Sequence, residues 1–221
     1  MCTPCPWARG SSLLEAYHNE AWGVPVHDDH LHFEMLVLET MQAGLSWLVV
    51  LKKREHYRRI CDSFDPHRIA LYGEDTIKEM MESPELIRNR RKLAAMVTNA
   101  KAFLRVQREF GSFDRYIWGW TGGRVIDHRL ASQDEMPVTN RLSDALSRDM
   151  KRRGFSFVGS ITLYSHLQAI GVIQDHLTSC FRYREITSAA GYPQRVEDNH
   201  SSTPQPPTPQ GPHTSSAPPG E

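Results

Sequence analysis

The chain of 221 residues has no long apolar segment and no excess of charge of either sign. No apolar run approaches the roughly 20 residues that a membrane-spanning helix needs, so we expect no membrane association. Lysine and arginine together number 26, aspartate and glutamate together also number 26, and the formal net charge is zero. Net charge therefore does not indicate nucleic-acid binding, and a DNA-binding surface would have to come from local clusters of basic residues.

Signals for secretion are also missing. The N-terminal residues MCTPCPWARG contain no apolar core of a signal peptide. We therefore expect a cytoplasmic protein that is not secreted and that, if bacterial, is associated with the nucleoid. Cysteine is scarce, with four residues at Cys2, Cys5, Cys61 and Cys180. In a chain without a secretory signal, these favour metal binding or free thiols over disulfides.

Proline is sparse in most of the chain and concentrated at one end. Eight of the fourteen prolines lie between Pro193 and Pro219. The same stretch is rich in serine, threonine and glutamine, a composition that cannot bury enough apolar surface to offset the entropy of ordering. We therefore predict a folded domain at residues 1–187 and a disordered tail at residues 188–221.

Helical periodicity dominates the predicted domain, and strand signals are weak. Apolar residues at helical spacing in segment 28–43 predict a central helix that is apolar on most sides. Further helices are predicted at 47–60, 74–82, 89–108, 112–120, 139–152 and 160–170, and another is predicted to open at Val172. The fold class is therefore predicted to be all-α, with one helical domain.

Cysteine and histidine residues near the two ends of this domain could hold a metal ion. His176 and Cys180 are four residues apart, which on a helix places both side chains on one face. Cys2, Cys5 and His18 stand near the other end. Spacing alone favours Cys2-x-x-Cys5 as the second half of the site, and chance spacing among eleven histidines is the alternative. A closed four-ligand site would be structural, because catalysis needs an open coordination position.

A single carboxylate, Glu39, lies inside the most apolar predicted helix. It is costly there unless it is paired or lines a cavity. Flat aromatic faces around it could come from Trp7, Tyr17, Trp22 and Trp47. An aromatic cage with one acidic group suits a flat, positively charged ligand that carries an amine. The alternative is that Glu39 caps buried backbone groups and the tryptophans belong to the core.

A basic segment follows the short connection between two predicted helices at residues 83–88. It contains Arg88, Arg90, Arg91 and Lys92. A helix hairpin can present backbone N–H groups and a helix N-terminus to a phosphate, with basic side chains beside them. We therefore expect these four residues to contact DNA, and a solvated basic face is the alternative.

Several motifs together resemble the 3-methyladenine DNA glycosylase I family, the zinc-containing branch of the helix-hairpin-helix glycosylases. They occur in the order of the family and cover nearly all of the predicted domain. The matching stretches are Tyr17-His18, Trp22-Gly23-Val24-Pro25, Glu39-x-x-Gln42-Ala43-Gly44-Leu45-Ser46-Trp47, Leu51-x-Lys53-Arg54-Glu55, Phe64-Asp65, Ile87-Arg88-Asn89-Arg90, Arg153-Gly154-Phe155-x-Phe157-Val158-Gly159, Gln168-Ala169-x-Gly171 and Asp175-His176 with Cys180.

This resemblance implies a helix-hairpin-helix glycosylase-like domain with a structural Zn²⁺ ion. The family's zinc ligands map onto Cys5, His18, His176 and Cys180, which leaves Cys2 out of the set. The ion would join the N- and C-terminal segments of the domain.

The resemblance also implies an activity, the hydrolysis of the N-glycosidic bond of 3-methyladenine in double-stranded alkylated DNA. Tyr17 and the catalytic residue Glu39 would hydrogen-bond the adenine edge, Trp47 would stack on the ring, and Trp7 and Trp22 would lie in the pocket wall. Methylation at N3 makes the purine cationic and weakens its glycosidic bond, so the enzyme must mainly flip the base out and hold the cation. We expect a monomer that does not cleave the strand.

Some residues depart from the family pattern. Asn19 and Ala21 replace two acidic residues, Leu14 replaces a pocket tyrosine, and Glu85 stands where related hairpins have glycine. These departures motivate an alternative, a non-catalytic DNA-lesion-binding module on the same fold. A second alternative is a helical scaffold for protein partners, with the proline-rich tail as a ligand. An iron–sulfur enzyme is disfavoured because the cysteines are not clustered.

Overall fold

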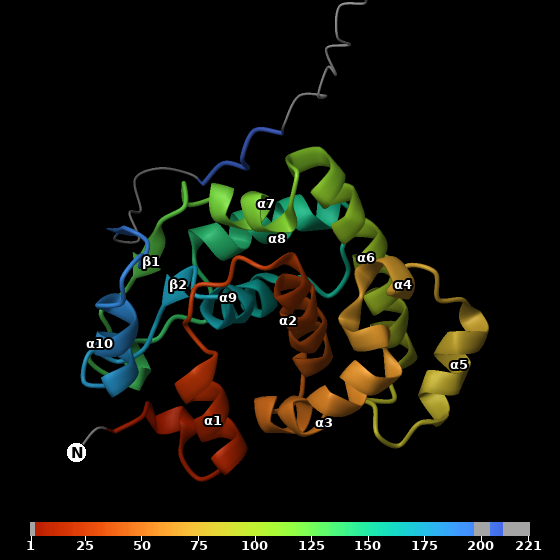
Figure 1. The fold of residues 1–221 in the computed structure, drawn as a ribbon, viewed down its shortest axis with the longest axis horizontal. Coiled ribbons are helices and arrows are strands. Elements are labelled where there is room, and N and C mark those ends of the chain that lie inside the picture. Colours follow the sequence, from red (N-terminus) through yellow and green to blue (C-terminus); the bar gives the residue numbers. More distant parts are fainter. Residues whose placement is uncertain (1–2, 197–203, 210–221) are drawn as a thin grey trace, which may run out of the picture.

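The computed structural model describes residues 3–196 and 204–209, and these are mostly helical (Figure 1). The helices are α1 Ser12–Glu20, α2 Asp29–Gln42, α3 Trp47–Ile60, α4 Pro66–Ile69, α5 Glu74–Glu82, α6 Arg90–Phe110, α7 Phe113–Gly119, α8 Arg141–Arg152, α9 Ser160–Ala169 and α10 Phe181–Thr187. Short 3-10 helices lie at Pro6–Ala8 (η1), Asp62–Phe64 (η2) and Gln133–Glu135 (η3). The fold is thus mostly helical, as predicted, but it is not all-α, because the described residues also form three short strands. No helix in the described part of the chain is long and apolar enough to cross a membrane.

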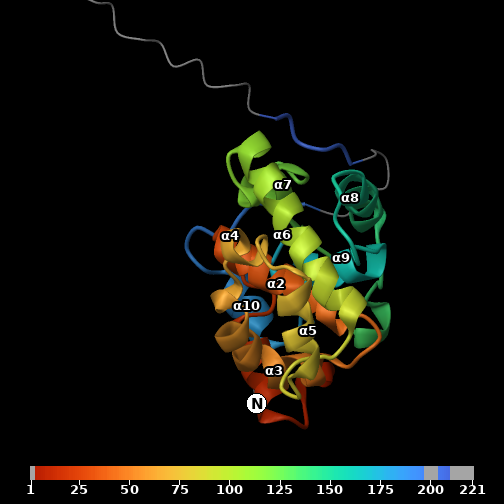
Figure 2. The same ribbon diagram turned by 90° about the vertical axis from the view of Figure 1, so that its right-hand side faces the viewer.

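Helix α2 lies in the middle of the molecule, between α7 and α8 on one side and α1 and α3 on the other (Figures 1 and 2). Asp28 caps its first turn, because the Asp28 side chain accepts a hydrogen bond from the N–H of Leu31 at 2.8 Å. Every residue from His32 to Met41 is buried. A helix that is buried on all sides must be apolar on most of them, so the central position predicted for this segment is confirmed.

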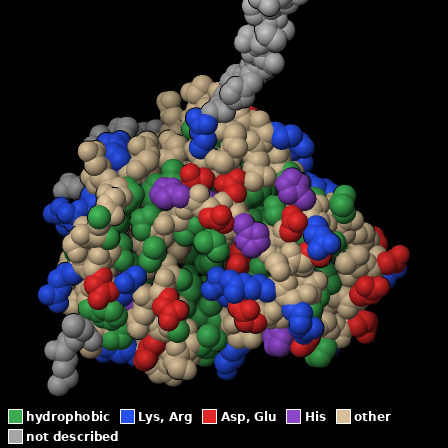
Figure 3. Space-filling model, in the orientation of Figure 1, with side chains coloured by type: hydrophobic (Ala, Val, Ile, Leu, Met, Phe, Trp, Pro, Cys, Tyr) green, Lys and Arg blue, Asp and Glu red, His purple; other side chains and the backbone are tan. Residues whose placement is uncertain are grey.

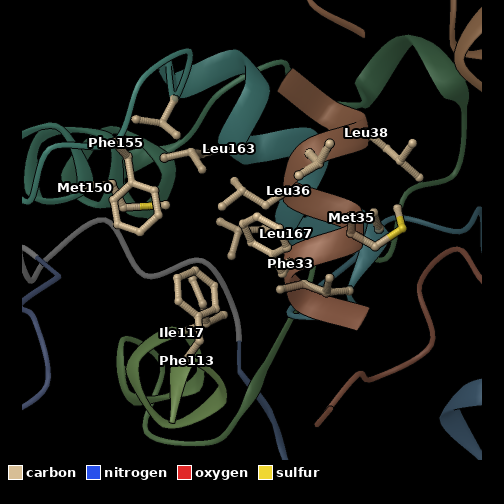
Figure 4. Packing of buried hydrophobic residues seen from close by; sticks show 14 of the residues in the cluster. Phe33, Met35, Leu36, Leu38, Phe113, Ile117, Met150, Phe155, Leu163 and Leu167 are labelled. Atoms are coloured by element: carbon tan, nitrogen blue, oxygen red, sulfur yellow. The ribbon is translucent and has the colours of Figure 1, made fainter. Parts of the chain in front are cut away.

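The contact between α2 and α9 forms the centre of the core. Figure 4 shows Phe33 and Leu36 from α2 beside Leu163 and Leu167 from α9, and all four side chains are at most 1% exposed. Burial of each such side chain stabilises the fold by about 1.5–3 kcal/mol. This close packing fixes α9 relative to α2, which carries Glu39.

A small sheet that the sequence did not predict lies beside α10 (Figure 1). Strands β1 Val125–Asp127, β2 Ile173–Gln174 and β3 Arg195–Val196 pair in the order β2-β1-β3, and both pairs are parallel. The prediction of a helix that opens at Val172 is therefore wrong, because this segment pairs with β1 and the next helix begins at Phe181.

The sheet also includes part of the predicted tail. Arg195 lies in β3, and its guanidinium is 3.3 Å from Asp127 of β1. Further along, Pro207 lies against Gly119, where an added Cβ would come within 2.5 Å of the proline ring. Residues 188–196 and 204–209 therefore lie on the domain, while residues 197–203 and 210–221 fall outside the described residues.

Candidate active site and metal-ligand cluster

A cavity of about 200 Å³ lies where α1, α2, α3 and α9 meet. Its lining residues are Trp7, Tyr17, Trp22, Glu39, Gln42, Trp47, Gln133, Met136, Ser165 and Gln168. All five residues that the sequence analysis placed in a base pocket are thus brought into one cavity. Pockets for drug-sized ligands usually enclose about 300–1,000 Å³, so this cavity suits a smaller molecule such as a single purine base.

Glu39 is the acidic residue of this cavity. It is 4% exposed, and burial alone raises the pKa of its carboxyl to about 8. The pKa of Tyr17 is raised well above its usual value, first by burial and then by the charge of Glu39. A carboxylate that has lost its water interacts strongly with a cation that enters the same cavity, because the local dielectric constant is low.

Aromatic rings surround the carboxylate. The ring centroids of Tyr17 and Trp47 are 5.1 Å apart, and those of Trp7 and Trp22 are 4.9 Å apart in an edge-to-face arrangement. The indole N–H groups of Trp7 and Trp47 are buried without a hydrogen-bond partner among the described residues. Such ring faces attract flat cations, so the cavity combines apolar walls with one anionic group.

Half of the residues that line the cavity were not predicted from the sequence. Gln133 and Met136 come from η3 and the turn after it, and Ser165 and Gln168 come from one face of α9, three residues apart. Gln42 belongs to the last turn of α2, three residues after Glu39 and on the same helix face. The motif Gln168-Ala169-x-Gly171 was a signal for part of this wall, but it gave no role for Gln168.

Cys5, His18, His176 and Cys180 form a second site next to the cavity. Their ligand atoms all lie within 4.8 Å of one another, and all four residues are buried. The Sγ atom of Cys180 is 3.5 Å from Nε2 of His18 and 3.8 Å from Nδ1 of His176, and Cys5 Sγ is 3.7 Å from the same Nδ1. Tetrahedral zinc would separate sulfur and nitrogen ligands by about 3.5 Å. The four donors therefore fit a zinc ion.

Hydrogen bonds orient both imidazoles for this role. His18 Nδ1 lies 2.7 Å from Oδ1 of Asn19, and His176 Nε2 lies 2.9 Å from the carbonyl oxygen of Trp22. Each contact places the ring proton on the outer nitrogen and leaves the lone pair of the other nitrogen facing the cysteines. Asn19, which replaces an acidic residue of the family pattern, thus still supplies a hydrogen-bond acceptor to His18. The pKa of the Cys180 thiol is lowered, chiefly by its hydrogen bond with Cys5.

The backbone brings the ligands together in a different way from the one predicted. His176 and Cys180 do not share a helix face, because both precede α10 and follow β2 in a loop. They converge because this loop folds back, while η1 and α1 bring in Cys5 and His18. Cys2, the competing candidate, lies outside the described residues.

The four basic residues after the α5–α6 connection have different positions. Arg88, Arg90 and Arg91 are exposed, and Arg90 forms an ion pair with Glu74. Lys92 is 5% exposed, and its ammonium group donates to the carbonyl oxygens of Met41 at 2.8 Å and Ala43 at 2.6 Å. The structure thus corrects the expectation of a DNA contact for Lys92, which instead caps the C-terminal end of α2.

The acidic residue in that connection, Glu85, is compensated by its neighbours. Its carboxylate pairs with Arg59 and lies 3.1 Å from His56. Lys53 stabilises the same turn by donating to the carbonyl oxygens of Pro84 and Glu85 at 2.9 and 3.0 Å. Basic and acidic side chains are interspersed over the face seen in Figure 3, in agreement with the balanced net charge.

A second helix hairpin joins α8 to α9. Gly154 and Phe157 in its turn have left-handed φ angles of 89° and 58°. Gly159 is the N-cap of α9, so no side chain caps this helix end, and the space beside its Cα is open. The first N–H groups of α9 thus have no side-chain cap, and an uncapped helix N-terminus can bind an anion such as a phosphate.

Comparison with known proteins agrees with this geometry. The family model described as methyladenine glycosylase matches residues 7–183. DNA-3-methyladenine glycosylase 1 of Escherichia coli is 38% identical over 179 residues, which are 81% of this chain and 96% of that protein. DNA-3-methyladenine glycosylase of Haemophilus influenzae is 41% identical over 180 residues, which are 81% and 97% of the two chains.

Solved structures of similar proteins have the same fold. A crystal structure of 3-methyladenine DNA glycosylase I is 42% identical with a TM-score of 0.78, and the match covers 81% of this chain and 98% of that chain. A variant of 3-methyladenine DNA glycosylase I in complex with 3-methyladenine is 31% identical with a TM-score of 0.79, covering 80% and 96%. The described chain thus belongs to the methyladenine glycosylase family.

Proposed function

We propose that this protein is a base-excision repair glycosylase that hydrolyses the N-glycosidic bond of 3-methyladenine in alkylated DNA. The observation that carries the proposal is the buried carboxylate of Glu39 in a cavity walled by aromatic rings. The named relatives, which align over four-fifths of this chain, support the same activity.

The reaction depends on the charge of the lesion. Methylation at N3 makes the purine a cation and a good leaving group, so the bond to the sugar is already weak. The base is flipped out of the stack into the cavity, where Trp47 stacks on it and Tyr17 and Glu39 hydrogen-bond its edge. Glu39 favours the cationic base over neutral adenine by electrostatic attraction, and water then attacks the sugar carbon.

Hydrolysis proceeds without strand cleavage in this proposal. Cleavage by a glycosylase usually needs an amine that forms a Schiff base with the sugar. Among the described residues that line the cavity, none is a lysine. Lys92 of the basic segment donates its ammonium group to two backbone carbonyls.

A structural zinc ion is the second part of the proposal. Cys5, His18, His176 and Cys180 would hold it as a closed set of four ligands. Such an ion supplies no chemistry to the reaction, because a full ligand set leaves no position for water or substrate. Its role is to join η1 and α1 to the loop before α10.

DNA contact is proposed at two hairpins. We propose the α8–α9 connection as the helix-hairpin-helix element, in place of the connection at 83–88 that was expected from the sequence, and the uncapped N-terminus of α9 would meet a phosphate there. Arg88, Arg90 and Arg91 of the α5–α6 connection add basic side chains. We propose that the protein acts as a monomer on double-stranded DNA.

The test is to incubate purified protein with methylated duplex DNA and to identify the released bases by chromatography. Release of 3-methyladenine that is reduced in Glu39→Gln and Trp47→Ala supports the glycosylase. Binding of the DNA without release of any base would favour the alternative, a non-catalytic lesion-binding module. Ala21 and Leu14, which motivate that alternative, lie partly buried against the core.

A further inference from the structure

Gln168 is a polar residue of the cavity wall that has no role in the reaction described above. It lies on α9, three residues after Ser165, which also lines the cavity. Its backbone carbonyl accepts a hydrogen bond from the N–H of Gly23 at 3.1 Å. The backbone of Gln168 is therefore tied to the segment that carries Trp22, and its side chain starts from a fixed position beside the cavity.

A buried carboxylate fixes the orientation of the Gln168 amide. Nε2 of Gln168 lies 2.7 Å from Oδ2 of Asp175. Asp175 is 1% exposed and is held in turn by the Tyr164 hydroxyl, which donates to Oδ2 at 2.6 Å, and by His128 Nδ1 at 2.6 Å from Oδ1. A carboxylate only accepts hydrogen bonds, so the NH₂ end of the amide must face Asp175. A flipped amide would place two acceptors in contact.

The other end of the amide is then available to a ligand in the cavity. Nε2 is committed to Asp175, and no hydrogen bond to Oε1 is found within residues 3–196 and 204–209, so Oε1 is the acceptor that Gln168 can offer to the cavity that it lines. Adenine has an amine donor at C6, whereas guanine has a carbonyl acceptor at the same position. A fixed, neutral acceptor therefore distinguishes these two purines even when both are methylated at N3 and carry the same charge.

We propose that Gln168, oriented by Asp175, selects 3-methyladenine over 3-methylguanine by accepting a hydrogen bond from the exocyclic amine. This inference rests on the proposed function, because it names the group of the substrate that the cavity reads. Glu39 hydrogen-bonds the base edge and attracts the positive charge that both bases share. Gln168 recognises the difference between them, and Asp175 is a positioning residue.

The test is a variant of matched length that keeps the volume of the side chain and removes its polar end. Gln168→Met should lower kcat/KM for release of 3-methyladenine by about 10- to 100-fold, the usual effect of losing one buried hydrogen bond. Release of 3-methylguanine should change little, so the ratio of the two rates should fall by a similar factor. Gln107→Met is the control, because Gln107 Nε2 makes the same 2.7 Å bond to Asp29 away from the cavity.

Asp175→Asn provides a second, independent variant. The new amide can donate to Gln168, which frees the Gln168 amide to turn its NH₂ end toward the base. The ratio of 3-methyladenine to 3-methylguanine release should therefore fall although Gln168 itself is unchanged. Thermal unfolding and metal content of each variant show whether it is folded.

Binding of the free bases separates this inference from the proposed function. Quenching of tryptophan fluorescence by free 3-methyladenine and free 3-methylguanine measures selectivity without turnover. A preference for 3-methyladenine that is lost in Gln168→Met supports the inference even if the wild-type protein releases no base, which would contradict the proposed function alone. Wild-type selectivity in a folded Gln168→Met variant would overturn the inference.

Discussion

His176 links the metal-ligand cluster to the base cavity through Trp22. Its Nε2 lies 2.9 Å from the Trp22 carbonyl oxygen, and the two rings are 4.5 Å apart edge-to-face. The opposite nitrogen of the same imidazole faces Cys5 and Cys180. The position of one wall of the cavity therefore depends on the cluster beside it.

If the proposed zinc ion is bound, its loss should destabilise the protein. We expect one zinc ion per chain, and its removal by a chelator or by Cys180→Ser should lower the free energy of unfolding by about 3 kcal/mol or more, or roughly 10 °C in Tm. Elemental analysis and thermal unfolding measure these effects. Cys61→Ala is the control, because Cys61 is a buried free cysteine outside the cluster. Full zinc content in Cys180→Ser would refute the assignment.

The activity should rise with pH because of Glu39. Burial raises the pKa of this carboxyl to about 8, and the cationic base requires its ionised form. The value of kcat/KM should therefore increase about tenfold per pH unit below pH 8 and level off above it. Initial rates of 3-methyladenine release, measured from about pH 5.5 to about pH 9.5, test this expected pH dependence. The rising limb should be missing in Glu39→Gln, and an unchanged limb would assign it to another group.

Arg91 and Lys92, which are adjacent in sequence, should behave differently in DNA binding. Arg91→Ala should weaken binding to any duplex and reduce the slope of log K against log salt concentration by about 1, since one phosphate contact is lost. Lys92→Met should leave the slope unchanged. It should instead lower the free energy of unfolding by about 1–3 kcal/mol, because two backbone carbonyls lose their donor. Titrations at several salt concentrations, with parallel unfolding curves, separate the two effects.

Acid should destabilise the core through His166. This residue of α9 is fully buried, neither ring nitrogen has a partner among the described residues, and burial lowers its pKa to about 3. Below pH 6.5 the unfolded chain binds a proton at His166 and the folded chain does not. The contribution of neutral His166 to the free energy of unfolding is therefore complete above pH 6.5 and is lost as pH falls toward about 3. The loss amounts to as much as roughly 5 kcal/mol. Denaturant unfolding of His166→Leu should show a weaker pH dependence, and an equal one would contradict the assignment.

Local sequence patterns predicted the helices well. The bounds of α3 and α5 agree with the predicted segments 47–60 and 74–82, because apolar spacing and turn residues act within one segment. Strand β2 could not be found in this way. Strand β2 has only two residues, and its Ile173 pairs with Ile126 of β1. Such a pairing depends on contacts between distant segments.

The residues of the site likewise divide into those that local sequence patterns predict and those that depend on the folded chain. Glu39 and the aromatic residues could be predicted, because a carboxylate inside an apolar helix is costly unless it is paired or lines a cavity. The position of Lys92 could not, because a run of basic residues indicates a surface while its acceptors belong to a helix 49 and 51 residues earlier. The orientation of Gln168 likewise follows from Asp175, which reaches it only in the folded chain.

The hydrogen bond between His176 and Trp22 spans 154 residues of sequence. During synthesis at about 5–20 residues per second, the segment with Trp22 would wait on the order of 8–30 s for its partner. Through this interval Trp22 has local contacts, such as the hydrogen bond from its N–H to the carbonyl oxygen of Tyr17, but lacks the contact with His176. Completion of the base cavity therefore has to wait until the segment with His176 has been synthesised.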